Sequence, residues 1–191
     1  MRTLVSALLP LACACVLFPA CVSTERPAGP LTGPKPVLST GLGQLRGVAF
    51  AGAVWIAPLP GKAELDLARR RGIGTLIDLS TDTDRAGLEL RHACLESGLE
   101  YVDARPSSHE APEDGLVDRV LDEIERRAPR AVLLVSADAS RTAMFFAIHR
   151  VAHDGVSLEQ ALVEARRCGM KAGSSESFVR RQVGRLTGRG S

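Results

Sequence analysis

Apolar and polar positions fall into blocks along the second half of the chain, and the most apolar block runs from Ala131 to Asp154. Four branched apolar residues, 132–135, predict a buried parallel strand, and the stretch 142–153 is long enough for the helix that follows it. The residues between them, 136–141, form a loop of small side chains that ends in Arg141. The pattern therefore places this loop between the carboxyl end of a strand and the amino end of a helix.

The same patterning predicts the other elements. The apolar run 48–57 predicts one or two opening strands, and 75–79 and 99–103 predict two further strands. Helices are predicted over 62–71, 84–97 and 175–186, and from Pro112 to just before Pro129. Ser157 and Gln160 have the spacing of a capping box that starts another helix. Because strands alternate with helices, we expect an α/β fold, with a mostly parallel central sheet of four to five strands and helices on both faces.

The amino-terminal segment has the pattern of an export signal over residues 1–20, with an early arginine and an apolar run. Its end, Phe18-Pro19-Ala20-Cys21, resembles the lipobox of bacterial lipoproteins, in which the cysteine is acylated. We therefore expect an exported protein, lipidated at Cys21 and anchored in the cell envelope on the periplasmic or outer face. A plain secretory signal with a chance cysteine is the alternative.

Residues 21–44 follow the signal and are rich in Pro, Gly, Ser and Thr, without periodicity. This composition predicts a flexible tether, so the globular domain is expected over 45–191. The chain is 45% apolar, which is enough for a substantial core.

The net charge of the chain is only +2, which predicts no nucleic-acid partner. A local excess of basic residues near the carboxyl end is opposed in sequence only by Glu176. We interpret it as a solvated helix face, with contact to anionic lipid headgroups as the alternative. Its members are Arg166, Arg167, Lys171, Arg180, Arg181, Arg185 and Arg189.

Several common site motifs are missing from the sequence. It contains no CxxC pair, HExxH, GxGxxG or Gly-rich Walker-type loop, so neither a metal nor a nucleotide cofactor is expected. Cys94 and Cys168 fall on apolar helix faces, which favours buried free thiols over a disulfide. No feature of the sequence identifies a protein partner.

The loop after strand 132–135 predicts an anion site. Backbone N–H groups and the helix dipole converge on an anion at the carboxyl end of such a strand. Arg141 adds a planar five-donor guanidinium that suits a phosphate. The residues expected to form the site are Ser136, Ala137, Asp138, Ala139, Ser140, Arg141 and Thr142.

Segments spread over 45–186 resemble the compact bacterial branch of the cysteine-dependent dual-specificity and tyrosine phosphatases. The resemblance rests on the order and spacing of several short segments. They are Gly72–Leu79, Gly98–Val102 before a Pro-containing loop, Ser136-Ala137 followed by Arg141-Thr142-Ala143, Ala147–Val151, Gly155, and Ala161–Ala165. The resemblance implies a phosphatase-like fold and a phosphorylated or otherwise anionic ligand.

The catalytic cysteine of that family is missing here. Family members place His-Cys before five loop residues and an arginine, so Val135 stands at the cysteine position and Leu134 at the histidine position. A loop one residue shorter would put Ser136 there. Valine cannot attack phosphorus, and an alcohol needs a partnered general base. Asp138 also replaces the usual glycine, where its carboxylate would repel a bound dianion.

The sequence therefore leaves three functions open. The domain is expected to be a pseudophosphatase that binds an anionic ligand or partner, or to be a structural module. An active phosphoester hydrolase that uses Ser136 or another group is the enzymatic alternative. The family's general acid, an aspartate after the third strand, has no counterpart singled out by spacing; the candidates are Asp103, His109, Glu110, Glu113 and Asp114.

Two other enzyme classes fit less well. Rhodanese-like sulfurtransferases also place a cysteine and an arginine around a strand-to-helix loop, but the cysteine is missing. A serine hydrolase would use Ser136 as its nucleophile, yet Leu134 and Asp138 stand where the GxSxG pattern has glycines.

Overall fold

The computed structural model describes residues 35–81, 86–106 and 112–188. All of them belong to one compact unit, 33–191. The predicted export signal, Cys21 and the first part of the predicted tether lie outside the described residues. Among the residues described, none of the helices has the length and apolar character needed to span a membrane.

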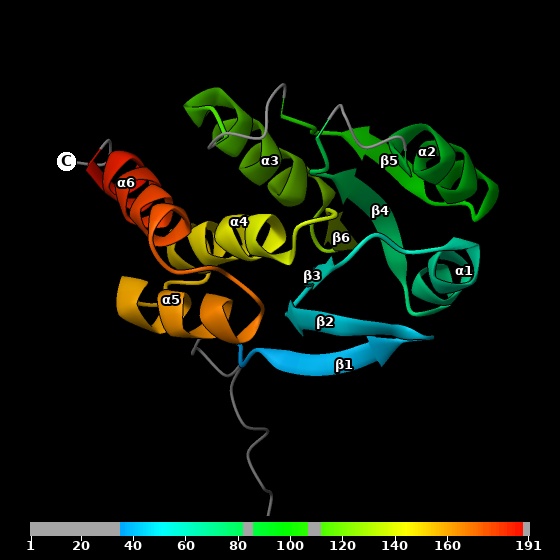
Figure 1. Cartoon of the computed structure of the whole chain (residues 1–191), viewed down its shortest axis with the longest axis horizontal. Coiled ribbons are helices and arrows are strands. Elements are labelled where there is room, and N and C mark those ends of the chain that lie inside the picture. The colour runs from blue at the N-terminus through cyan, green and yellow to red at the C-terminus, as the bar shows by residue number, and fades with distance from the viewer. Residues whose placement is uncertain (1–34, 82–85, 107–111, 189–191) are drawn as a thin grey trace, which may run out of the picture. The chain divides into compact units, whose positions relative to one another are not determined.

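A six-stranded sheet in the order β1-β2-β3-β6-β4-β5 forms the centre of the fold (Figure 1). Strands β3, β6, β4 and β5 are parallel, whereas β1 and β2 form an antiparallel meander that joins the sheet at β3. The bounds are β1 Leu38–Leu42, β2 Leu45–Ala51, β3 Val54–Ala57, β4 Ile73–Asp78, β5 Glu100–Asp103 and β6 Ala131–Val135. The predicted α/β class with a mostly parallel sheet is confirmed.

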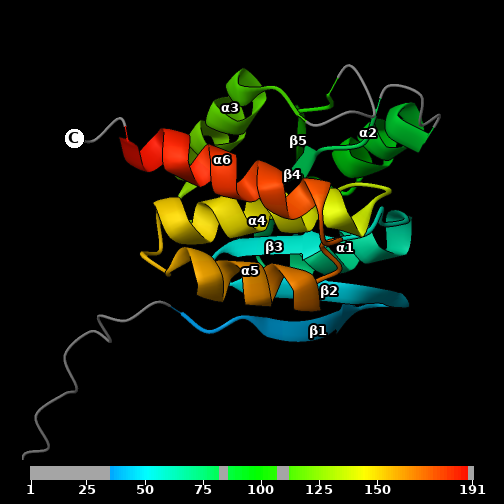
Figure 2. The same cartoon turned by 60° about the vertical axis from the view of Figure 1, so that its left-hand side comes forward.

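Helices cover both faces of the sheet, as predicted. Each face of the sheet has its own buried apolar cluster. One cluster packs α1 and α2 against one face, and the other packs α3, α4, α5 and α6 against the opposite face. Figures 1 and 2 show α4 between the sheet and the pair α5 and α6. The bounds are α1 Lys62–Arg70, α2 Ala86–Glu96, α3 Asp114–Arg127, α4 Ala139–Ala152, α5 Leu158–Arg167 and α6 Ser174–Gly188.

The central helix α4 is buried at every position from 140 to 150. This follows from its sequence, which is apolar on nearly every face and therefore needs partners on all sides. Helices α5 and α6 supply those partners on the side away from the sheet. The helix consequently holds the residues at its amino end in one position relative to the sheet.

The sheet has six strands in the described residues, rather than the predicted four to five. The additional strand, β1, falls inside the range 21–44 that was predicted to be a tether. Only Leu42 of its five residues is buried, because β1 is an edge strand. An edge strand of this kind carries too little apolar alternation to be recognised from sequence.

Two helix starts test the capping predictions. The Ser157 hydroxyl accepts a hydrogen bond from the Gln160 backbone N–H at 3.3 Å, which confirms the predicted start of α5. The Gln160 side chain donates to Glu164 instead of reaching back, so the reciprocal half of the capping box was wrong. Helix α4 begins at Ala139, three residues before the predicted Thr142, because Asp138 caps it.

Candidate functional site

The loop that follows β6 lies where three parallel strands end. Val135 is paired with Ala57 of β3 and with Asp78 of β4. The Leu79 N–H donates to the Val135 carbonyl at 2.8 Å and continues the β4–β6 pairing by one residue. The predicted loop thus sits at the carboxyl edge of the sheet, which is the edge where α/β proteins bind ligands.

The loop itself comprises only Ser136, Ala137 and Asp138, since Ser140 and Arg141 belong to the first turn of α4. The Asp138 carboxylate accepts from the Ser140 N–H at 3.0 Å, and the backbone carbonyl of Asp138 accepts from the Arg141 N–H at 3.0 Å. Asp138 therefore binds two of the backbone donors that the sequence analysis assigned to an anion.

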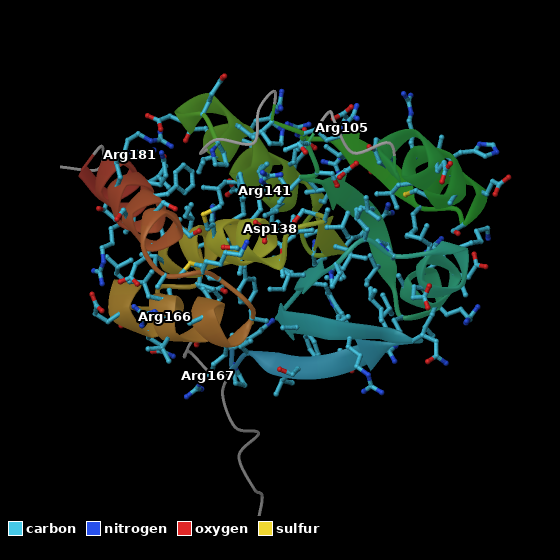
Figure 3. All side chains as sticks on the ribbon, viewed as in Figure 1. Arg105, Asp138, Arg141, Arg166, Arg167 and Arg181 are labelled. Atoms are coloured by element: carbon cyan, nitrogen blue, oxygen red, sulfur yellow. The ribbon has the colours of Figure 1, made fainter. Side chains whose placement is uncertain are left out.

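Arg141 places a cation at this edge. Arg141 is 8% exposed, and its Nη1 donates to the Leu79 carbonyl at 3.0 Å. That bond holds the guanidinium at the end of β4. The backbone of Arg141 lies in the first turn of α4, where the helix dipole is positive. In Figure 3 Arg141 and Asp138 lie close together at the amino end of α4.

The turn between α5 and α6 contributes a second cation, Lys171, which the sequence analysis placed on a solvated face. Its Nζ lies 3.5 Å from Asp138 Oδ2, and its backbone N–H donates to Ser140 Oγ at 2.9 Å. Gly169 allows this close approach: a Cβ there would lie 3.1 Å from that of Ala139, at a φ of +99°. No local signal marks Lys171, because tertiary packing alone brings it to the loop.

Neither position that could replace the family cysteine carries an activated nucleophile. Val135 is fully buried and packs in the apolar cluster on the α1 and α2 side of the sheet. The hydroxyl of Ser136 is buried and donates to the Asp138 carbonyl at 2.5 Å. A carbonyl oxygen is not a general base, so this hydrogen bond does not activate the serine.

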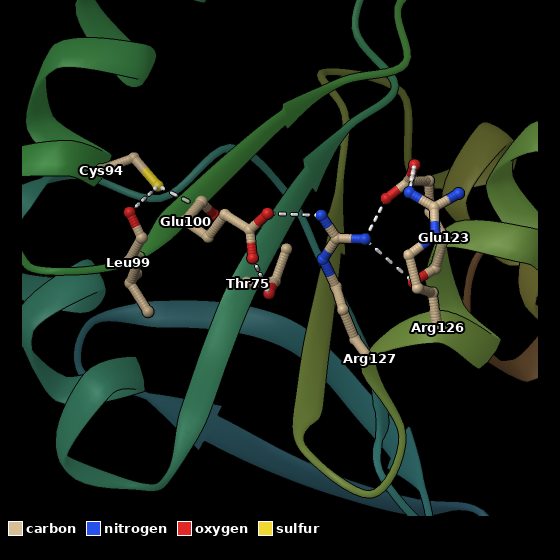
Figure 4. A network of polar contacts seen from close by, with 7 residues as sticks. All are labelled: Thr75, Cys94, Leu99, Glu100, Glu123, Arg126 and Arg127. Carbon is tan, nitrogen blue, oxygen red and sulfur yellow. Dashed lines mark hydrogen bonds and ion pairs between the residues drawn. The ribbon is translucent and has the colours of Figure 1, made fainter.

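The two cysteines of the domain are free, as predicted; Cys94 is also buried as predicted, whereas Cys168 is only half-buried. The Cys94 thiol faces the Leu99 and Glu100 carbonyls at 3.8 and 3.7 Å, beside an ion-pair network centred on Arg127 (Figure 4). Burial raises the pKa of Cys94 to about 12 and also raises the pKa of Cys168. Both thiols are therefore protonated, and unreactive, at neutral pH.

Two of the described candidates for a general acid, Asp103 and Asp114, have side-chain partners within the fold. Asp103 forms an ion pair with Arg105 at 2.7 Å, and that hydrogen bond lowers the pKa of the carboxyl. Asp114 accepts from the Gln182 side chain of α6. Glu113 is the N-cap residue of α3 and makes no capping bond with its side chain. His109 and Glu110 lie outside the described residues.

A buried carboxylate beside the loop, Asp78, was missed by the sequence analysis. Its Oδ1 accepts from the Ser80 N–H at 2.9 Å and its Oδ2 accepts from the Tyr101 hydroxyl at 2.7 Å. Burial and this bond raise the pKa of Tyr101. Asp78 thus links the ends of β4 and β5 through these hydrogen bonds. Its position at the end of a buried strand was the sequence feature that could have marked it as a site residue.

The carboxyl-terminal basic residues are largely paired with carboxylates. Arg166 bonds Glu176 at 2.6 Å, and Arg180 bonds both Glu159 and Glu176. These pairs lie on the exposed surfaces of α5 and α6, where Figure 3 labels Arg166, Arg167 and Arg181. Glu176 is therefore not their only opposing charge. In the part of the chain that the structure describes, no three His, Cys, Asp or Glu side chains form a group that could hold a metal ion.

No protein-family model matches the sequence, and no curated protein matches it either. Solved structures do match in fold. Tk-PTP in its active form is 22% identical, over 69% of this chain and 91% of its own, with a TM-score of 0.58. TpbA of P. aeruginosa is 18% identical, over 80% and 89% of the two chains, with a TM-score of 0.59.

Kinase associated phosphatase, in a form whose catalytic-site cysteine is replaced by serine, is 15% identical. The match covers 81% of this chain and 97% of that one, with a TM-score of 0.61. A cysteine-to-serine form of TpbA in complex with phosphotyrosine also matches, at 16% identity and a TM-score of 0.55. The described domain therefore has the fold of the tyrosine and dual-specificity cysteine phosphatases.

Proposed function

We propose that the domain binds a phosphorylated or similar oxyanionic ligand at the amino end of α4 and does not hydrolyse it. The observation that carries the proposal is the placement of Arg141, whose buried guanidinium is tied to the Leu79 carbonyl at the carboxyl edge of the sheet. The helix dipole adds positive potential at the same place, and Lys171 lies there as well, paired with the Asp138 carboxylate. TpbA, which shares the fold, binds phosphotyrosine as a cysteine-to-serine form.

The absence of hydrolysis rests on the residues at the nucleophile positions. Val135 has no reactive atom, and the Ser136 hydroxyl donates to a carbonyl oxygen rather than to a base. Binding and hydrolysis make separate demands on the site: the first needs positive charge and donors, and the second needs a thiolate or activated alcohol as well. The charge is present, whereas the described residues supply no nucleophile of that kind.

Calorimetric titration of the full-length chain with O-phosphotyrosine tests the binding. We expect Arg141→Gln to weaken the affinity at least tenfold, because a hydrogen bond to a charged group contributes about 1.5–3 kcal/mol. Arg167→Gln is the matched control, since it removes the same charge from the exposed surface of α5. Equal affinities for both variants would remove Arg141 from the site.

An assay with p-nitrophenyl phosphate in the presence of a metal chelator tests the lack of catalysis. We expect no turnover above background. Turnover that disappears in Ser136→Ala would establish the alternative, a hydrolase that uses Ser136.

The location of the domain is part of the proposal. Residues 1–20 direct export, and a lipid on Cys21 holds the domain at the membrane of the cell envelope. Labelling of the expressed chain with a palmitate analogue tests this, and we expect Cys21→Ser to abolish the label. An unlabelled wild-type chain would contradict lipidation.

A further inference from the structure

A polar cavity of about 420 Å³ lies at the amino edge of the sheet, where β4, β5 and β6 begin, and therefore at the opposite edge from the candidate loop. Its volume is in the range of small-molecule sites. Most of its lining is polar. The lining residues are Arg69, Gly72, Gly74, Gly98, Glu100 and Arg130.

Two of these glycines lie directly beside the two arginines. A Cβ on Gly98 would lie 3.8 Å from Arg69 Nε, and a Cβ on Gly74 would lie 3.7 Å from Arg130 Cδ. Gly98 precedes β5, whereas Arg130 precedes β6, and β4 lies between these two strands. Arg69 and Arg130 therefore approach the cavity from the β5 side and from the β6 side of β4.

Both arginines are available to a ligand. The two residues are exposed, and neither guanidinium forms an ion pair or a hydrogen bond within the part of the chain that the structure describes. The carboxyl ends of α1 and α2 face the same edge, but their carbonyls are occupied. The Arg69 carbonyl accepts from the Gly72 N–H at 3.1 Å, and the Leu95 carbonyl accepts from the Gly98 N–H at 3.0 Å.

The carboxylate in the described lining, Glu100, already has partners (Figure 4). Its Oε1 accepts from Arg127 Nη2 at 2.5 Å, and its Oε2 accepts from the Thr75 hydroxyl at 3.3 Å. The hydrogen bond from Arg127 lowers the pKa of Glu100, so this carboxylate is charged and paired at neutral pH. The positive charges of Arg69 and Arg130 remain without a counter-charge, and a ligand with two negative charges would balance them.

We propose that this cavity binds a small dicarboxylate, with one carboxylate on Arg69 and the other on Arg130. A guanidinium offers parallel N–H donors that match the two oxygens of a carboxylate. Because the two arginines approach from opposite sides of β4, a ligand with two separated anionic groups can bind both, whereas a single anionic group binds one of them at a time. The proposal does not depend on the function of the candidate loop.

NMR titration of the full-length chain with succinate tests the proposal, and acetate is the comparison ligand with a single carboxylate. We expect succinate to shift the amide signals of Gly72, Gly74 and Gly98. It should bind at least tenfold more tightly than acetate, because it makes a second charge-assisted contact. The amide signal of Ala137 reports separately on the candidate loop, so the two sites are distinguished in one spectrum.

Arg69→Gln should bring the affinity for succinate down to that for acetate. Arg70→Gln is the matched control, because it removes the same charge from the next exposed residue of α1, which does not line the cavity; it should leave the affinity unchanged. Unmoved glycine signals, equal affinities of the wild type for succinate and acetate, or equal losses in the two variants would overturn the proposal. Tighter binding of inorganic phosphate than of succinate would also overturn it, because the cavity would then hold a single phosphate group.

Discussion

Removing the charge of Asp138 should strengthen oxyanion binding at the candidate loop. The Asp138 carboxylate accepts from the Ser140 N–H at 3.0 Å and lies 3.5 Å from the Lys171 ammonium. It thereby occupies a donor and a cation that an incoming phosphate would use. Asp138→Asn keeps an oxygen that can cap the helix and removes only the charge.

The size of the effect follows from the exposure of this side chain. Asp138 is 47% exposed, so the high-dielectric end of the Coulomb range applies: about 1 kcal/mol for each unit of ligand charge at about 5 Å. A phosphate monoester carries a charge of about −1.5 to −2, which gives about 1–2 kcal/mol, or a roughly 5- to 30-fold lower dissociation constant. The gain should shrink as salt is added.

Calorimetric titration with O-phosphotyrosine measures this gain. Asp122→Asn on the exposed side of α3 is the matched control, and it should leave the affinity unchanged. Asp138→Gly also frees the Ser140 N–H, so it should bind at least as tightly as Asp138→Asn. Equal or weaker binding by both Asp138 variants, with their folds intact, would refute the idea that this carboxylate competes with the ligand.

Three further predictions concern stability. Arg150 is fully buried and bonds Glu164 at 2.9 Å. Arg150→Met should therefore lower the free energy of unfolding, measured by urea denaturation, by about 3–5 kcal/mol, because it leaves Glu164 buried without its partner. The double variant Arg150→Met, Glu164→Met should regain part of that loss. Burial lowers the pKa of His149 from 6.5 to about 4, so the unfolded chain takes up a proton at a higher pH than the folded chain does. The contribution of His149 to the free energy of unfolding should therefore be fully present above pH 6.5 and fall by up to about 3 kcal/mol as the pH drops to 4. Thermal unfolding of His149→Gln should lack this decline; an identical pH profile would contradict the assignment. Ser157→Ala should cost about 1 kcal/mol in urea unfolding, because it removes the N-cap of α5, whereas no loss would show that the cap contributes nothing.

The regular parts of the fold could be predicted because their signals are local. The apolar run 132–135 has the pattern of a buried strand, and the residues after it are apolar on every side, as the buried helix α4 requires. The Ser157 cap of α5 could also be predicted, because Ser157 and Gln160 lie three residues apart in the sequence, as in a capping box. Strand β1 was not readable, because an edge strand with one buried residue has no alternating pattern.

The candidate site was only half predictable. Arg141 and the strand-to-helix turn are local features, and the structure places both at the carboxyl edge of the sheet. Lys171 and the Leu79 carbonyl reach the loop only through tertiary packing, so sequence spacing could not find them. The role of Asp138 as the N-cap of α4 was missed, although an aspartate just before a helix is an ordinary capping residue.

An NMR titration of the full-length chain with O-phosphotyrosine decides whether the amino end of α4 binds an oxyanion and leaves it intact. We expect shifts of the Ala137, Asp138 and Ala139 amide signals and of the Arg141 side-chain signals, while the phosphorus signal of the ligand stays that of the monoester. Unmoved loop signals, or a growing signal of inorganic phosphate, would contradict it.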